Sequence, residues 1–409
     1  MFARPSGPWM NLCLLAVFVL TIIFSISTLV YERRDLPFTC RTWADCGFLE
    51  RPSYKHDIPA NLDVVVDQGK SHDDTTFYTR EILKLPQPNL LILIVSKDSG
   101  SWGSDAMSSG RTPADLIDML IRTDLDFTSV SIGILTTDRT EFDAIKKATE
   151  ALPFARASIY LQQPDENRPE GSSHAITGDD SAAYIRRASI ARARNYLMLR
   201  TVRDEAHLLW IDADIVELSE GLVQRMMHQA NSNPHVGLLT ARCKLRSEDS
   251  DYDTKAWRIH REGEEGEGGA SRTASSEDVT DGEAAQREYE GMLGAVGLAR
   301  QSSAAAELRD TREQAGELLD GTAAGGDDSA LVPLDSTGAT ILYIRSSLVL
   351  RGVTFPPFNV VGTLWDHEGW TGMETEGICY MAKRITGKGC YLLGGSNYVR
   401  HADLGTTVS

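Results

Sequence analysis

The sequence predicts an α/β fold, in which a mostly parallel sheet is covered by helices and preceded by an N-terminal transmembrane helix. Three observations support this prediction. Short apolar runs alternate with amphipathic stretches through the central part of the 409 residues, which is typical of repeated βαβ units. One of these runs, Leu90–Ser96 (LLILIVS), is almost continuously apolar, as in strands that are covered on both faces. A longer uncharged run at residues 11–30 precedes them all.

The uncharged run (NLCLLAVFVLTIIFSISTLV) predicts a membrane anchor. At about 1.5 Å per residue, a helix of this length spans a hydrocarbon core roughly 30 Å thick. The run is longer than the apolar region of a signal peptide and ends in charged residues, so we expect a retained anchor after a short tail at residues 1–10. Arg4 precedes it, while Arg33 and Arg34 follow beside two acids, so charge counting leaves the topology open.

Residues 31–86 are predicted to form a stem between the anchor and the folded core. Four prolines interrupt this stretch, and no amphipathic period is sustained in it. Cys40 and Cys46 lie close together there, and a disulfide between them or two free thiols are both consistent with the sequence.

The core elements each follow from a local signal. Thr112 and Pro113 form a pair of N-cap and first-turn residues that opens a helix, and Ser219 is expected to cap another. The predicted strands are short apolar runs between polar residues. In chain order, we expect strands at 90–96, 129–136, 158–161, 207–211, 236–241, 339–344 and 390–393, and helices starting at 113 and spanning 141–151, 182–202, 219–230 and 375–385.

Residues 261–330 differ from the rest of the chain in composition. They hold 17 Asp and Glu against six Arg, together with 12 of the 34 glycines. Such a segment buries too little apolar surface to offset the entropy of ordering it. We therefore expect a solvated, largely mobile insertion that separates two parts of one catalytic domain, residues 87–260 and 331–409.

Composition also excludes several classes of protein. The net charge of −17 and the pI near 5.0 argue against a nucleic-acid partner, because no basic surface is available to neutralise phosphates. Six cysteines are too few for a disulfide-built scaffold, and the absence of a Cys-x-x-Cys pair argues against a structural zinc site.

The strongest local signal for chemistry is Asp212-Ala213-Asp214, which follows directly on the apolar run HLLWI. In parallel sheets, ligands bind beyond the carboxyl ends of the strands. Carboxylates at that position suit Mg²⁺ or Mn²⁺, which keep coordination positions open for substrate phosphates. An Asp-x-Asp sequence alone also arises by chance in solvated loops, so its place after a buried strand is what favours a functional interpretation.

Six segments resemble one family, the fungal Golgi mannosyltransferases of the mannan-polymerase type (glycosyltransferase family 62). The resemblance covers roughly residues 88–260 and 331–403 and rests on the combination of motifs rather than on any one of them. The segments are RRASIARARNYL (186–197), LLWIDADIVEL (208–218), VPLDSTGATILYIR (332–345), TFPPFNVVGT (354–363), ETEGICYMAKR (374–384) and SNYVRHAD (396–403).

The resemblance implies a specific activity and setting. It implies a GT-A-like (Rossmann-like) nucleotide-sugar transferase fold, GDP-mannose as donor, Mn²⁺ as the ion with Mg²⁺ as an alternative, and extension of α-mannosides on N-linked glycans of glycoprotein acceptors. It also implies a single-pass type II protein of the Golgi membrane with a lumenal catalytic domain, in a hetero-complex with related mannosyltransferases. The acidic insertion is longer and richer in Gly and Ala than the family pattern leads us to expect.

Candidate metal and donor residues follow from the motifs. Asp214 is the first choice for direct ligation, with Asp212 contacting the ion or the donor ribose, and His401 matches a histidine of the family near its C-terminus. Outside that pattern a lone histidine is more often a packed or surface residue. For the donor, we single out side chains at strand ends and on one helix face, each of which could equally belong to a polar turn or a solvated surface: Ser96, Lys97, Asp98, Asp138, Arg187 and Arg194.

Glu374, Glu376 and Asp335 are the candidates for the sugar and acceptor side. Glu376 is assigned to catalysis together with Asp212 and Asp214, although helix capping is the alternative for both glutamates. The family retains the α configuration of the donor, which we attribute to front-face displacement, in which the leaving phosphate takes the acceptor's proton and no dedicated base is required. Two other hypotheses remain: a non-catalytic scaffold subunit of a transferase complex, and a transferase that uses another nucleotide-sugar.

Overall fold

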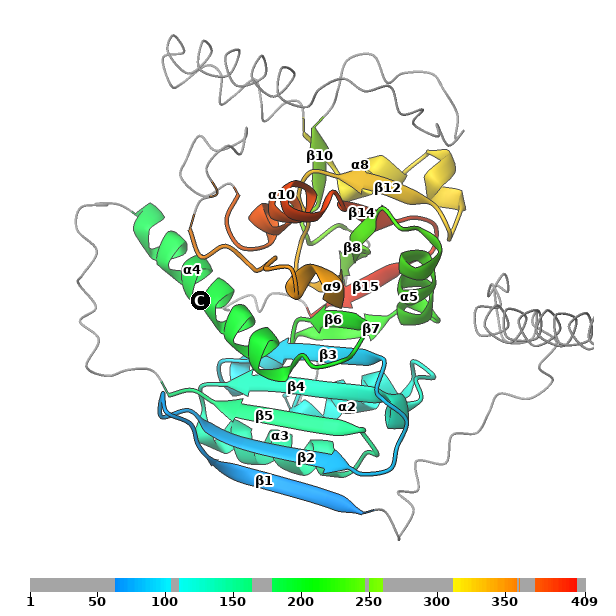
Figure 1. Ribbon diagram of the computed structural model, residues 1–409. Helices are drawn as coiled ribbons and strands as arrows, with labels where there is room; N and C mark the ends of the chain where they lie inside the picture. Colours follow the sequence, from blue (N-terminus) through cyan, green and yellow to red (C-terminus); the bar gives the residue numbers. More distant parts are fainter. Residues whose placement is uncertain are drawn as a thin grey trace, which may run out of the picture. The chain divides into compact units, whose positions relative to one another are not determined.

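The computed structural model describes residues 63–103, 110–163, 179–246, 250–259, 312–358, 360 and 372–402. All of them belong to the second of two compact units, Tyr54–Ser409. They form a ten-stranded sheet and two smaller sheets of two and three strands (Figure 1). The predicted anchor at 11–30 and the pair Cys40 and Cys46 lie outside the described residues. Within the ranges given above, no helix has both the length and the apolar character needed to cross a bilayer.

The large sheet has the strand order β1-β2-β5-β4-β3-β6-β13-β8-β14-β12. Neighbours β5, β4, β3 and β6 are parallel, and so are β8 and β14. Only β2, β13 and β12 run opposite to the other strands, so the predicted α/β class with a mostly parallel sheet is confirmed. The bounds are β1 Val64–Lys70, β2 Thr76–Ile82, β3 Leu90–Val95, β4 Val130–Thr136, β5 Arg156–Leu161, β6 His207–Ile211, β8 Val236–Thr240, β12 Leu331–Leu334, β13 Ile341–Arg345 and β14 Gly389–Leu393.

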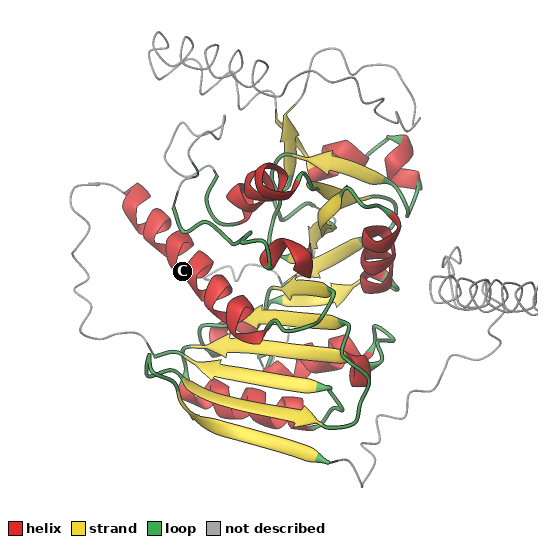
Figure 2. Ribbon diagram, viewed as in Figure 1, coloured by secondary structure: helices red, strands yellow, loops and turns green. Residues whose placement is uncertain are grey.

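Helices cover both faces of this sheet (Figure 2), and the alternation of strand side chains shows why. In β3, Leu91 and Leu93 pack into the core beneath α4, whereas Ile92 and Ile94 pack into the core beneath α2 and α3. Figure 1 shows α4 in front of the strands and α2 and α3 behind them. On the α2 side lie α2 Pro113–Ile121, α3 Arg139–Glu150 and α5 Leu222–Ser232; on the α4 side lie α4 Asp179–Thr201, α8 Ala315–Leu319, α9 Ser346–Val349 and α10 Thr375–Thr386.

Two regions that the sequence analysis left without regular structure are folded. Within the predicted stem, β1 and β2 form an antiparallel hairpin that extends the sheet beyond β5. The alternation in β2, where Tyr78, Arg80 and Ile82 are buried, is the signal that was missed. Within the predicted insertion, β11 (Arg312–Gln314) pairs with β10 (Trp257–Ile259), and the short helix α8 buries Leu318 and Leu319. The part of the insertion up to residue 311 lies outside the described residues.

The three-stranded sheet β7-β15-β9 lies next to the end of β6 and corrects two further predictions. It consists of β7 (Ile215–Leu218), β15 (Tyr398–His401) and β9 (Arg242–Leu245). Residues 390–393 are therefore not the last strand. Ser219 does not cap α5: the N-cap is Gly221, with φ of 70°, and the Ser219 hydroxyl accepts a hydrogen bond from the Tyr398 amide instead.

A disulfide joins Cys379 of α10 to Cys390 of β14. Both cysteines are buried in the core on the α4 side of the sheet. The bond fixes the helix that begins at Thr375 to a strand of the large sheet. It therefore constrains the segment that presents Glu374 and Glu376.

Candidate functional site

The ends of three strands, β3, β4 and β6, bring several of the predicted site residues to one edge of the large sheet. β6 pairs in parallel with β3, and β3 with β4, so their carboxyl ends lie side by side. Asp212 follows β6, Ser96 and Lys97 follow β3, and Asp138 lies two residues beyond β4. This is the edge at which open α/β sheets bind ligands.

The Asp-Ala-Asp turn is fixed through its backbone. The amide of Asp212 donates to Thr340 O at 3.0 Å, which continues the pairing of β6 with β13. The amide of Ile215 donates to Asp212 O at 3.2 Å and closes the turn. The amide of Ala402 donates to Asp214 O at 2.9 Å, so the chain after β15 also holds the turn. Both carboxylates are thus attached to a rigid backbone.

Asp214 and His401 face each other. His401 Nε2 lies 2.8 Å from Asp214 Oδ2, and the imidazole stacks on the Tyr252 ring with centroids 3.7 Å apart. Burial by itself would lower the pKa of His401, but the hydrogen bond and the charge of Asp214 raise it overall. The other oxygen of Asp214, Oδ1, is buried and has no hydrogen-bond partner among the described residues. His401 is the final residue of β15, a strand that was not predicted from the sequence.

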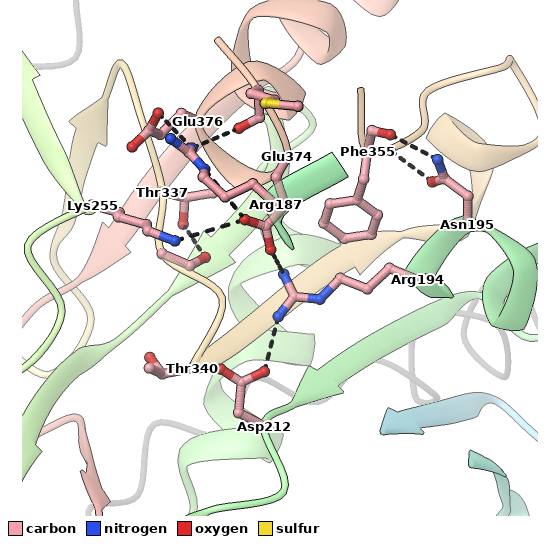
Figure 3. Close-up of polar contacts among 12 residues, drawn as sticks. Arg187, Arg194, Asn195, Asp212, Lys255, Thr337, Thr340, Phe355, Glu374 and Glu376 are labelled. Carbon is pink, nitrogen blue, oxygen red and sulfur yellow. Dashed lines mark hydrogen bonds and ion pairs between the residues drawn. The ribbon is translucent and has the colours of Figure 1, made fainter. Parts of the chain in front are cut away.

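Asp212 belongs to a network of carboxylates and cations between α4 and the start of α10 (Figure 3). Arg194 Nη2 lies 2.9 Å from Asp212 Oδ1, and Arg194 Nη1 lies 3.0 Å from Glu374 Oε1. Arg187 Nη2 lies 2.7 Å from Glu376 Oε2. Burial raises the pKa of Asp212 to about 6, although the charge of Arg194 opposes the change.

Glu374 has the most unusual backbone of the site. Its φ of 55° and ψ of −122° are rare for a residue with a side chain, and the residue is only 2% exposed. It occupies the N-cap position of α10, but its side chain makes no capping hydrogen bond. The capping alternative is therefore wrong for Glu374, whose carboxylate points at Arg194. Strained residues of this kind persist where the surrounding contacts require them, often at functional sites.

Arg187 and Arg194 share a face of α4 as predicted, but in the structure they contact carboxylates. Arg194 is 5% exposed and also lies over the rings of Trp210 and Phe355. Arg187 additionally donates to Met373 O at 3.1 Å. These contacts exclude the solvated-surface alternative for both arginines. Their contact with a donor diphosphate stays a prediction.

Two residues of the site were missed by the sequence analysis, Asp253 and Lys255. Lys255 Nζ lies 3.7 Å from Glu374 Oε2, and the Lys255 amide donates to Asp253 Oδ1 at 2.9 Å. Burial raises the pKa of Asp253. A Cβ on Gly338 would lie 1.4 Å from Asp253 Oδ2, so only glycine leaves room for this carboxylate. The segment Asp251–Lys255 has no period or motif, and only its density of charged residues could have drawn attention to it.

The turn Asp335-Ser336-Thr337-Gly338 packs against the segment that holds Asp253 and Lys255. The Asp335 amide donates to Trp257 O at 3.1 Å, and the Ser336 hydroxyl donates to Lys255 O at 2.8 Å. The turn therefore has a structural role, in which Gly338 lies against Asp253. A contact of Asp335 with an acceptor stays a prediction.

The candidate donor residues at the ends of β3 and β4 include two helix caps. Asp98 Oδ1 accepts from the Gly100 amide at 3.0 Å and caps the 3₁₀ helix η2 (Ser99–Trp102). Asp138 Oδ1 accepts from the Glu141 amide at 2.9 Å and caps α3. Ser96 is buried, and its hydroxyl has no hydrogen-bond partner among the described residues. Lys97 is exposed next to it.

The residues predicted to hold a metal ion have the right chemistry for a hard divalent cation. Asp214 offers a buried oxygen without a hydrogen-bond partner among the described residues, Asp212 lies at the same strand end, and His401 adjoins Asp214. Carboxylate oxygens with one imidazole suit Mn²⁺. In the part of the chain that the structure describes, no three His, Cys, Asp or Glu side chains are already arranged as a ligand set.

Comparison with known proteins identifies relatives of the chain. The model of the Anp1 family matches residues 87–359, which include Asp212 and Asp214 but not Glu374 or His401. The chain is 27% identical over 256 residues to the mannan polymerase complex subunit mnn9 of Schizosaccharomyces pombe, covering 62% of this chain and 63% of that protein. It is 24% identical over 291 residues to the mannan polymerase complex subunit MNN9 of Candida albicans, covering 67% of each.

The chain therefore spans less than two thirds of the length of the first of these relatives. Among solved structures, it is similar to 4-diphosphocytidyl-2C-methyl-D-erythritol synthase from Anaerococcus prevotii. That similarity covers 43% of this chain and 61% of the other, at 14% identity and a TM-score of 0.24, which is too low to support an argument about fold or function.

Proposed function

The chain belongs to the Anp1 family, and on this premise we propose that it is an α-mannosyltransferase that moves mannose from GDP-mannose to mannoside acceptors on N-linked glycans, with retention of configuration. The observation that supports a catalytic role best is the Asp-Ala-Asp turn at the carboxyl edge of the sheet. One of its carboxylates keeps a buried oxygen without a partner among the described residues, and the other contacts the guanidinium of Arg194. A protein that served only as a scaffold would have no use for either feature.

We assign the metal site to Asp212, Asp214 and His401, with Mn²⁺ as the preferred ion. A divalent cation bound there would stabilise the negative charge that develops on the departing diphosphate. The protein's part is to keep both carboxylates at one place, which the backbone hydrogen bonds of Asp212 and Asp214 achieve. The His401 imidazole lies beside Asp214, 2.8 Å from Oδ2, and this contact raises the pKa of His401 against the effect of burial.

The carboxylate–guanidinium network is assigned to the sugar side. Glu374 is buried and held by Arg194, and one of its oxygens, Oε2, has no hydrogen-bond partner in the described residues. Glu376 is held by Arg187. Fixed carboxylates of this kind accept hydrogen bonds from sugar hydroxyls without first reorganising. Ser96, Lys97, Asp98 and Asp138, at the neighbouring strand ends, are assigned to the nucleotide.

The reaction needs no protein base in this proposal. The bond between mannose C1 and the phosphate oxygen breaks while a bond from C1 to the acceptor oxygen forms on the same face. The proton of the acceptor hydroxyl passes to the leaving phosphate oxygen, so charge and atoms balance. Glu374 and Glu376 act by holding the sugar so that the acceptor oxygen reaches C1.

The setting proposed for the protein is the Golgi membrane, with the catalytic part lumenal and residues 11–30 as a type II anchor. We also propose a hetero-complex with related mannosyltransferases. Support for the complex comes from the relatives, whose names describe subunits of a mannan polymerase complex. Protease protection of sealed vesicles tests the orientation, and co-purification of tagged full-length chain tests the complex.

The decisive experiment compares wild type with Asp214→Ala in GDP-mannose turnover with Mn²⁺. We expect the variant to lose at least 100-fold in rate, while Asp67→Ala, an exposed carboxylate on β1, keeps the wild-type rate. Equal rates for wild type and Asp214→Ala would remove the site assignment. Calorimetry with GDP and UDP tests the donor: a clear preference for uridine would contradict GDP-mannose.

The second candidate function is a non-catalytic subunit that supports a catalytic partner. The names of the relatives favour it, because a subunit of a complex need not carry the activity. Asp214→Ala, measured in the complete complex, distinguishes the scaffold function from the catalytic one. If Asp214→Ala leaves turnover of the complex unchanged and the partner's own site accounts for it, the scaffold function is the correct one.

A further inference from the structure

Arg111 lies beside the Asp-Ala-Asp turn and joins it to another part of the edge. The residue precedes the N-cap of α2 and is only 5% exposed. Its Nη1 donates to Trp102 O at 3.1 Å and to Ala213 O at 3.0 Å. Trp102 ends η2, in the loop after β3, and Ala213 is the central residue of the turn after β6. One guanidinium therefore connects the two loops that are assigned to nucleotide and metal.

A separate observation shows that these two loops are in direct contact. Gly103 has φ of 75°, and a Cβ built on it would lie 2.4 Å from Ala402 Cβ and 3.5 Å from Asp214 Cβ. The loop after β3 thus packs tightly against the turn and against the residue that follows β15. Trp102 is itself anchored, because its indole Nε1 donates to Glu141 Oε2 of α3 at 2.7 Å. Asp214 is therefore packed against a loop that is itself held to α3.

Burial of the Arg111 guanidinium costs folding free energy, and no ion pair among the described residues offsets that cost. Burial lowers the pKa of its guanidinium, while the charges of Asp115 and Asp214 oppose that change. Among the described residues, Arg111 forms no ion pair, and its Nη2 is buried without a hydrogen-bond partner. A buried cation that is not paired with a carboxylate is unfavourable for folding. Its two carbonyl contacts and its charge near Asp214 point to a role in the site.

We propose that Arg111 is a positioning residue: through the carbonyl of Ala213 it fixes Asp214 against the loop that presents Ser96, Lys97 and Asp98. The proposal about the reaction rests on the proposed function, whereas the mechanical coupling of the two loops does not. Outer residues that orient ligands typically contribute 10–100-fold to affinity or activity. We expect an effect of about that size on donor use and none on acceptor binding, which takes place on the α10 side.

The test compares Arg111→Gln and Arg111→Lys with Arg122→Gln. Arg122 lies at the other end of α2 and is exposed, so it serves as a matched control. For Arg111→Gln we expect kcat/KM for GDP-mannose to fall about 10–100-fold, with KM for the acceptor within about twofold of wild type. Arg111→Lys keeps the charge and has one nitrogen that can donate to both carbonyls, as Nη1 does, but its side chain is one bond shorter, so it should recover only part of the loss. Arg122→Gln should match wild type.

Hydrogen exchange gives a readout that does not depend on activity. In Arg111→Gln, amide exchange in residues 97–103 and 212–216 should rise together, while β4 keeps its protection. The proposal is overturned if Arg111→Gln has the same kinetics and the same amide exchange as the wild type. It is also overturned if exchange in the variant rises evenly through the domain. If Arg111→Gln does not fold, the same two criteria are applied to Arg111→Lys. If exchange rises in both segments of Arg111→Gln but the wild type shows no transferase activity, the proposed function is refuted and the coupling of the two loops stands.

Discussion

His207 is expected to make the stability of the protein depend on pH below neutrality. It begins β6, the strand that ends at Asp212, and it is 2% exposed. Its Nδ1 lies 2.6 Å from the Tyr343 hydroxyl. Burial, and to a smaller extent the charge of Arg345, lowers the pKa of His207 to about 4. The folded state therefore holds this imidazole neutral at a pH where the unfolded chain protonates it.

The direction and size of the effect follow from that pKa. A histidine with an ordinary pKa of 6.5 in the unfolded chain and about 4 in the folded protein contributes its full stability above pH 6.5. The contribution is lost as pH falls from 6.5 to about 4, because the unfolded state then binds more protons than the folded state. The full difference corresponds to about 3 kcal/mol, and roughly 2 kcal/mol of it is lost between pH 7 and pH 5.

The measurement is the free energy of unfolding in urea at pH 7 and pH 5, for wild type and His207→Asn. Asparagine keeps a partner for the Tyr343 hydroxyl but does not titrate in this range. The difference between wild type and variant should change by roughly 2 kcal/mol between the two pH values. His235→Asn, a substitution of an exposed histidine, should leave the pH dependence as in wild type. A wild-type-minus-variant difference that is the same at both pH values would refute the buried, neutral state of His207.

Three further substitutions test the site and its supports. Arg194→Met removes the cation shared by Asp212 and Glu374. We expect the free energy of unfolding to fall by about 3 kcal/mol and turnover to fall at least 10-fold. Arg192→Met, on the exposed face of α4, should change neither quantity. Gly338→Ala forces the Asp253 carboxylate to move, so turnover should fall while the melting temperature stays near that of wild type; an unchanged rate would show that Asp253 is not needed in place. Cys379→Ser opens the disulfide to Cys390, which should cost about 3 kcal/mol in the free energy of unfolding; a wild-type melting temperature in the variant would contradict a stabilising role.

The predictions that succeeded rest on local patterns. The runs at β3 and β6 are apolar throughout, because both faces of these strands are covered, and such runs are visible without knowledge of the fold. Because β6 can be predicted from its apolar run, the position of Asp212 at the carboxyl end of this strand can be predicted as well. Thr112 and Pro113 likewise fix the start of α2 through their own geometry. The family resemblance was confirmed by the match to Anp1 over residues 87–359.

The predictions that failed depend on contacts between distant segments. Ser219 has the chemistry of a cap, but its hydroxyl is taken by the amide of Tyr398, 179 residues away in sequence, and Gly221 becomes the N-cap. β13 is visible as an apolar run, yet nothing in its sequence tells that it enters the sheet antiparallel to β6 and β8. Lys255 enters the site only because its segment packs against the turn that begins at Asp335. Such residues carry no periodic signal of their own.

The charges of the site make a last prediction about the order in which ligands bind. The described cluster contains five carboxyl groups (Asp212, Asp214, Asp253, Glu374 and Glu376) against four permanent cations (Arg111, Arg187, Arg194 and Lys255), with His401 as a fifth cation when it is protonated. Arg187, Arg194 and Lys255 are already engaged by carboxylates, and the carboxyl groups still outnumber the permanent cations, so a diphosphate that arrived alone would meet excess negative charge. Like charges at such short range repel strongly away from bulk water.

A divalent cation bound at the proposed site of Asp212 and Asp214 would reverse that balance, and nucleotide affinity should therefore depend on metal. We expect GDP to bind at least 10-fold more weakly after treatment with a chelator than with Mn²⁺ present, as measured by calorimetry. In Asp214→Asn, which has lost one negative charge, the metal should matter less and binding without metal should improve. If GDP binds equally well with and without metal in the wild type, the excess of carboxyl groups does not control nucleotide binding, and the reasoning from charge is wrong.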